Sequence, residues 1–143
     1  YIDIGREEGA TVAAGGGVPE DKDTGYFVEP TVLADVTNDM TVAREEIFGP
    51  VLSIIEVSDE EEALAVANDS PFGLTSCVWT NDLTRAHTVA DRLDYGMVMV
   101  NETPNTWPQT PFGGVKQSGH GRAQGEEAIQ TYTEVKNVHV NLE

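Results

Sequence analysis

Continuous apolar runs alternate with amphipathic stretches through the middle of the chain. The run VLSIIEV, Val51 to Val57, is rich in β-branched residues and is typical of a strand buried on both faces. Two further strands are predicted at GLTSCVWT, residues 73–80, and at GMVMVN, residues 96–101. Ligands in α/β sheets tend to bind beyond the carboxyl ends of strands, so Asn101 and the loop after it become candidates for function.

Two helices are predicted between these strands. Ser58 and Glu61 form an S-x-x-E capping box, which predicts a helix through about Asn68 with acidic residues facing its positive end. Segment 82–94 has apolar residues at helical spacing, namely Leu83, Ala86, Ala90 and Leu93. The order strand, helix, strand, helix, strand predicts parallel pairing with right-handed crossovers, and therefore an α/β fold.

The flanking segments are shorter and more varied. YIDIGREEG, at the start of the chain, is typical of the last turns of a helix, and Thr11 to Gly16 is a short strand candidate. Segment 27–36 is expected to be extended, with Pro30 at an edge or a bulge. A helix is expected from Gly121 to Ala128, and VKNVHVNL, 135–142, alternates like a strand at a solvent edge. The chain begins at Tyr1 without a methionine, so we expect a fragment of a longer protein.

The charge balance excludes some partners. The chain has 143 residues with 25 acidic and 8 basic side chains, for a net charge of -17. Such a surface repels nucleic acid and anionic membranes. Two interpretations remain, an acidic docking module for a basic partner or a surface adapted to high salt, and the scatter of the acids favours the second. No segment has the length of a membrane span, and we expect no signal peptide. The single cysteine, Cys77, rules out an internal disulfide and fits a reducing cytosol, so we expect a cytoplasmic protein.

Few side chains have the spacing of a known catalytic or metal site. The only cysteine, Cys77, lies in an apolar run and is expected to be a small buried residue. His87, His120 and His139 lack metal-ligand spacing, so no metal site is predicted. The glycine-rich segment GGVKQSGHG matches no phosphate-binding motif and is expected to let the backbone approach a pocket wall.

The stretch EEIFGPVL admits two interpretations. Glu46 and Phe48 would face the same side of an extended segment, where a carboxylate can bind sugar hydroxyls and a ring can pack against a flat heterocycle. The alternative is a surface acid and a core phenylalanine before a Gly-Pro turn. The residues alone favour that alternative.

Four strings in this order and spacing, GYFVEPTV, EEIFGPV, NDSPFGL and PFGGVKQSGHGR, resemble the NAD(P)-dependent aldehyde dehydrogenases. The resemblance covers essentially the whole chain and matches the C-terminal part of that family's catalytic domain. It implies a three-layer α/β fold with a parallel-rich sheet and crossover helices. It also implies a division into residues 1–133, part of the catalytic domain, and 134–143, an edge strand through which subunits form a dimer or tetramer.

The resemblance also implies roles for particular residues. Glu46 looks like the carboxylate that binds the nicotinamide ribose, and Phe48 like the ring beside the nicotinamide of NAD or NADP, so the functional interpretation is now favoured. Asn101, Trp107 and Phe112 resemble residues of the aldehyde tunnel. Arg122 and Glu134 resemble positions near the subunit interface, and we expect them to form an ion pair in the oligomer.

Several parts of such an enzyme are missing. The family's nucleophilic cysteine, its general-base glutamate and its dinucleotide-binding domain lie upstream, and Cys77 does not match the catalytic position. The fragment alone is therefore expected to be inactive. The family commonly has GRExG where this chain has Ala123 after Arg122, which puts the proton relay to the base in doubt. The alternatives are a non-catalytic α/β interaction module and an enzyme that transfers the acyl group to coenzyme A.

Overall fold

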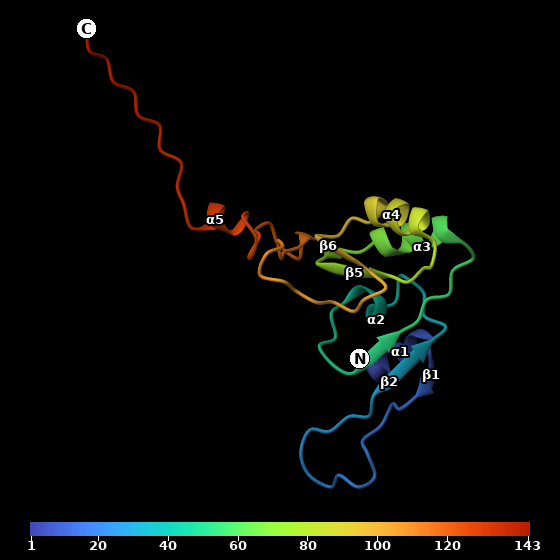
Figure 1. Ribbon diagram of the computed structural model, residues 1–143. Coiled ribbons are helices and arrows are strands. Elements are labelled where there is room, and N and C mark those ends of the chain that lie inside the picture. The colour runs from blue at the N-terminus through green and yellow to red at the C-terminus, as the bar shows by residue number, and fades with distance from the viewer. The chain divides into compact units, whose positions relative to one another are not determined.

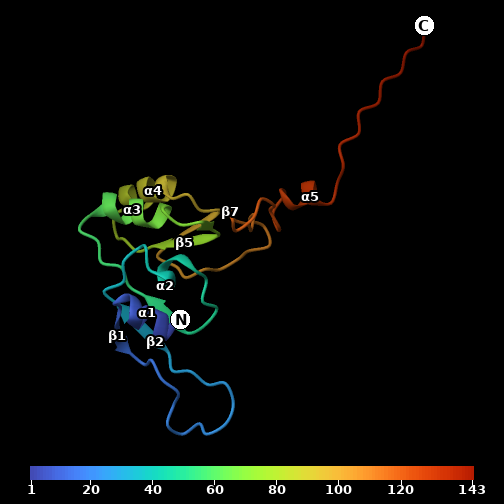
Figure 2. The same cartoon turned by 180° about the vertical axis from the view of Figure 1, so that it is seen from behind.

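The computed structural model describes residues 1–143, which form two compact units, Tyr1–Asp69 and Ser70–Glu143. Their elements are coloured along the chain in Figure 1 and seen from behind in Figure 2. The first unit contains α1 (Ile2–Glu8), β1 (Thr11–Ala14), β2 (Thr31–Ala34), α2 (Thr41–Arg44), β3 (Val51–Ser53) and α3 (Glu60–Asn68). The second contains β4 (Phe72–Gly73), β5 (Thr75–Val78), α4 (Leu83–Arg92), β6 (Met97–Val100), β7 (Val115–Lys116) and α5 (Ala128–Thr131). The α/β class is confirmed, and the three-layer arrangement stays a prediction.

The first unit is built on a three-stranded sheet in the order β1-β2-β3. β1 pairs antiparallel with β2, and β2 pairs parallel with β3. The centre of its core is the fully buried Leu33 of β2, which packs with Val42 of α2. Gly5 lets α1 pack closely, because a Cβ there would lie 3.0 Å from Leu33 Cδ1.

β3 differs from its prediction. It is an edge strand paired only with β2, so the expectation of burial on both faces is wrong in this structure. Leu52 is 59% exposed and Ile54 is 40% exposed. A strand is buried on both faces only where other segments cover it, which its own residues do not determine.

The helix α3 confirms the predicted helix, but its first residue differs. The N-cap is Asp59, whose side chain accepts a hydrogen bond from Glu62 N at 2.9 Å. The Glu62 carboxylate in turn accepts bonds from the N–H and hydroxyl groups of Ser58, at 2.7 and 2.6 Å. The capping pair therefore lies one residue later than the predicted Ser58 and Glu61.

The second unit contains the other two predicted strands. β5 and β6 pair in parallel and are joined through α4, as the strand-helix-strand pattern predicts. Asp82 caps α4 by accepting a hydrogen bond from Arg85 N at 3.1 Å. Cys77 is exposed on β5, so its predicted burial is wrong, because this two-stranded sheet leaves that position uncovered.

The end of the chain has less regular structure than predicted. The helix expected from Gly121 to Ala128 is wrong, because α5 begins only at Ala128 and the preceding residues form loops. Residues 133–143 form no strand in the single chain and extend away from the rest of the second unit (Figure 1). The oligomerisation strand at 134–143 stays a prediction, since its pairing partner would be another subunit.

Candidate functional site

The segment from Glu46 to Phe48 follows α2, and the side chains of Glu46 and Phe48 are exposed to solvent. Ile47 packs against the core, whereas Glu46 is exposed and Phe48 is 90% exposed. Phe48 has a φ of 51°, a left-handed conformation that is unusual for a bulky residue. The alternative of a core phenylalanine therefore does not hold in this chain.

The carboxylate of Glu46 makes no polar contact in the structure, unlike that of its neighbour. Glu45 accepts a hydrogen bond from the Tyr1 hydroxyl at 2.7 Å, and this bond raises the pKa of Tyr1. Glu46 therefore keeps its oxygens available for hydroxyl donors, as a residue that binds a sugar requires.

A pocket of about 280 Å³ lies in the second unit beside β6. Trp107 and Phe112, both predicted as wall residues, line it together. Phe112 is also joined to Ala123 by two main-chain hydrogen bonds, at 2.6 and 2.7 Å. The other lining residues are Gly96, Met97, Val98, Met99, Glu102, Asn105, Thr106, Thr110, Pro111 and Gln124.

Glycines allow the backbone to approach this pocket wall closely. A Cβ on Gly96 would lie 1.8 Å from the carbonyl oxygen of Gly113, so no other residue fits at this crossing. Gly113 and Gly114 are both buried. The predicted function of the glycine-rich segment, close approach of the backbone, is confirmed.

Asn101 is not among the residues that line the pocket. Its side-chain amide donates to Thr80 O and accepts from Thr80 N, both at 2.8 Å. These two bonds join the ends of β5 and β6, and the φ of Asn101 is 55°. Its place in an aldehyde tunnel stays a prediction.

Glu102 and Gln124 are among the polar lining residues that the sequence did not single out. Glu102 directly follows Asn101, so its position after a strand could have indicated it. Gln124 has a φ of 63°, and its Oε1 is buried without a hydrogen-bond partner. No local pattern around Gln124 indicates this conformation.

The interface residues Arg122 and Glu134 are not paired in the single chain. Arg122 Nη1 donates to the carbonyl oxygens of Gly114 and Gly121, at 2.7 and 3.0 Å. Glu134 is exposed. The ion pair was predicted for the assembled oligomer and stays a prediction.

No group of three or more His, Cys, Asp or Glu side chains is arranged to hold a metal ion. None of the helices has the length and apolar character needed to cross a bilayer.

Comparison with known proteins decides the family. The model of the Aldehyde dehydrogenase family matches residues 1–138. The chain belongs to this family. It is 51% identical over 143 residues to a betaine aldehyde dehydrogenase of Rhizobium leguminosarum bv. trifolii, covering 99% of this chain and 29% of the relative. A Rhizobium etli betaine aldehyde dehydrogenase is 53% identical over 144 residues, with the same two coverages.

Solved aldehyde dehydrogenases share its fold. The NAD+ complex of the Bacillus cereus aldehyde dehydrogenase superposes with a TM-score of 0.93 and 48% identity, covering 100% of this chain and 29% of that one. The NAD+ complex of the Mycobacterium tuberculosis aldehyde dehydrogenase gives a TM-score of 0.89 and 48% identity, covering 94% and 28%. The chain thus spans less than a third of the length of the aldehyde dehydrogenases that it matches.

The segment 46–48 of this aldehyde dehydrogenase chain exposes a carboxylate and an aromatic ring to solvent. The Glu46 carboxylate has no partner, and the Phe48 ring is open to solvent two residues later. A ribose presents vicinal hydroxyl donors, and a nicotinamide ring presents a flat face. The roles of Glu46 and Phe48 in binding the cofactor stay predictions.

Proposed function

We propose that the chain is the C-terminal part of the catalytic domain of an enzyme that oxidises an aldehyde to a carboxylic acid with NAD or NADP. The observation that carries this proposal is the free carboxylate of Glu46 beside the exposed ring of Phe48, on a segment held by the core through Ile47. The bound cofactor would accept the hydride from the substrate. In this proposal Glu46 binds the ribose and Phe48 orients the nicotinamide.

The nucleophile and the general base come from other parts of the full-length protein. Cys77 lies within β5 and does not line the pocket, so it is not proposed as the nucleophile. We further propose a cytoplasmic homo-oligomer that assembles through residues 134–143.

The pocket in the second unit supports a cationic aldehyde as substrate. The aromatic rings of Trp107 and Phe112 and the carboxylate of Glu102 line one small space. A quaternary ammonium group is attracted both to aromatic faces and to a carboxylate. Betaine aldehyde carries such a group, and the Rhizobium relatives are betaine aldehyde dehydrogenases.

The test is NAD(P)H absorbance with the full-length protein, each cofactor, betaine aldehyde and its uncharged isostere 3,3-dimethylbutanal. We expect kcat/KM to be about tenfold higher for betaine aldehyde, because a cation-π contact in a desolvated site is worth up to about 2 kcal/mol. Glu102→Gln should reduce this ratio, whereas Glu46→Gln should raise the KM for the dinucleotide and leave the ratio unchanged. Equal rates for both aldehydes would contradict the substrate, and no turnover with either cofactor across a wider panel would contradict the enzyme.

A further inference from the structure

The helix α2 immediately precedes the proposed cofactor segment. It has four residues, Thr41–Arg44, and a single turn of helix is not stable by itself. Its position must therefore come from the groups that surround it. Contacts at both ends and on its buried face supply that support.

The start of α2 is held by α1. The Glu8 carboxylate accepts bonds from Thr41 N at 2.7 Å and from Thr41 Oγ1 at 2.5 Å. It serves as an external cap, because Met40 at the N-cap position has no side-chain oxygen to offer. On the buried face, Val42 is 4% exposed and its carbonyl accepts a bond from Ser53 Oγ at 3.0 Å.

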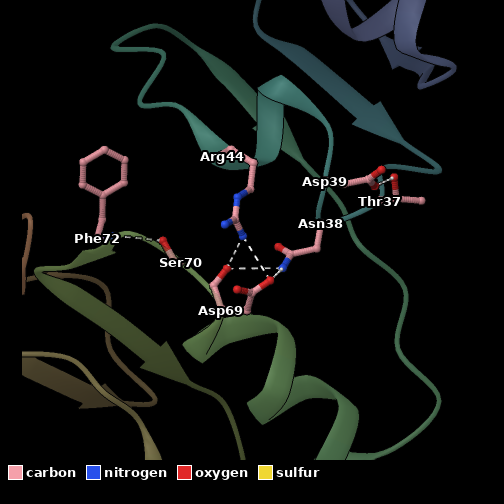
Figure 3. A network of polar contacts seen from close by, with 7 residues as sticks. All are labelled: Thr37, Asn38, Asp39, Arg44, Asp69, Ser70 and Phe72. Carbon is pink, nitrogen blue, oxygen red and sulfur yellow. Dashed lines mark hydrogen bonds and ion pairs between the residues drawn. The ribbon is translucent and has the colours of Figure 1, made fainter.

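The other end of α2 is fastened to the end of α3 (Figure 3). Arg44 Nη1 donates to the main-chain oxygen of Asp69 and, at 3.1 Å, to its Oδ2. Asn38 Nδ2 donates to the same two oxygens of Asp69, at 3.3 and 2.8 Å. We call these three residues, Asn38, Arg44 and Asp69, the α3 clamp.

The α3 clamp also places a positive charge at the C-terminal end of α3. The last turn of α3 contains no basic residue, and its terminal carbonyl groups carry partial negative charge. Arg44 brings a positive charge from another element to this helix end. The two side chains are 37% and 70% exposed, and an ion pair so exposed contributes little to the free energy of unfolding. The greater effect of the clamp is geometric, because two hydrogen bonds from Arg44 to Asp69 fix the direction of the Arg44 side chain, and two more from Asn38 hold Asp69 in place.

We propose that Arg44 and Asp69 are positioning residues that set the place of Glu46 and Phe48 for binding the dinucleotide. This inference rests on the proposed function of segment 46–48. Only Glu45 separates Arg44 from Glu46, so a shift at the end of α2 passes along the main chain to the cofactor segment. Ile47 packs against the core between Glu46 and Phe48, and the α3 clamp fixes the position of the main chain just before Glu46.

The test compares variants of the full-length protein by NADH fluorescence titration, steady-state kinetics and thermal unfolding. We expect Arg44→Gln and Asp69→Asn each to weaken NADH binding about three- to tenfold and to raise the KM for NAD. The KM for the aldehyde should stay the same, because the substrate pocket is built from other residues. Arg44→Lys keeps the positive charge and one donor nitrogen, so it should retain part of the affinity for NADH that Arg44→Gln loses.

A matched control is available in the same unit. Arg6 also forms an exposed ion pair, with Asp3 at 2.9 Å, and also donates to a main-chain oxygen, that of Gly16 at 3.0 Å. Arg6→Gln should change the melting temperature about as much as Arg44→Gln and leave NADH affinity unchanged. Unchanged affinity in Arg44→Gln, or an equal loss in both variants, would overturn the inference alone. Failure of the unmodified protein to bind NADH would overturn the proposed function and the inference with it.

Discussion

At the scale of single residues, two serines on strands differ in whether their hydroxyl groups form a hydrogen bond. Ser53 Oγ donates to Val42 O at 3.0 Å, whereas Ser76 Oγ is buried on β5 without a hydrogen-bond partner. An unsatisfied buried polar group costs about 1–3 kcal/mol. We therefore expect Ser76→Ala to leave the melting temperature of the full-length protein unchanged or to raise it, as measured by thermal unfolding.

Ser53→Ala is the matched control for this prediction. It removes the donor to the Val42 carbonyl and should destabilise the protein by about 1 kcal/mol. Equal losses of melting temperature in both variants would show that the Ser76 hydroxyl is paired in the full-length protein, and the prediction would be wrong.

At the scale of elements, the existence of helices was easier to predict than their ends. The helical spacing of segment 82–94 lies in local sequence, and it matches α4, which Asp82 caps. The run SDEEE at the start of α3 contains two pairs with capping-box spacing, Ser58 with Glu61 and Asp59 with Glu62. Spacing alone cannot choose between them, because the backbone conformation at the N-cap decides which oxygen reaches the free N–H groups.

The candidate site was predictable only where chemistry and local sequence coincide. The acid and ring of EEIFGP are unusual beside an apolar run, and the structure places both of them in solvent. The place of Gln124 depends instead on its left-handed backbone and on the main-chain pairing of Phe112 with Ala123. Such pairing between distant residues has no signature in a short window of sequence.

The carboxylate of Glu62, in the first turn of α3, makes the free energy of unfolding depend on pH. Hydrogen bonds from the hydroxyl and N–H of Ser58 lower the pKa of Glu62 below its ordinary value. A carboxylate with a lowered folded-state pKa adds stability above its unfolded pKa, and this stability is lost as the pH falls through the folded pKa. We expect Glu62→Gln to lower the melting temperature near pH 7 and to approach the unmodified protein as the pH falls to about 3.

The control for this prediction is Glu56→Gln in the same region. Glu56 is exposed and makes no polar contact in the structure, so its replacement should leave the pH dependence of the melting temperature unchanged. If Glu62→Gln and the unmodified protein show parallel curves down to the lowest pH, the capping role of Glu62 is wrong.

At the scale of the whole molecule, charge is the dominant feature. The chain has 25 acidic and 8 basic residues, so at least 25 − 8 = 17 carboxylates lack a lysine or arginine of their own. Repulsion among them opposes the compact state. Salt weakens this repulsion, since the Debye length falls from about 10 Å at 0.1 M to about 3 Å at 1 M.

We expect the melting temperature of the full-length protein to rise when potassium chloride is raised from about 0.1 M to about 3 M. A charge-reduced variant should show a smaller rise, because replacing four exposed acids by amides changes the net charge of this chain from -17 to -17 + 4 = -13. The four substitutions avoid every capping and clamp residue: Glu7→Gln, Glu20→Gln, Asp23→Asn and Glu56→Gln. Sucrose stabilises proteins by exclusion from their surface rather than by screening, so it should stabilise both proteins equally. If salt raises both melting temperatures by the same amount, screening is not the cause, and the acids are better explained as a docking surface for a basic partner.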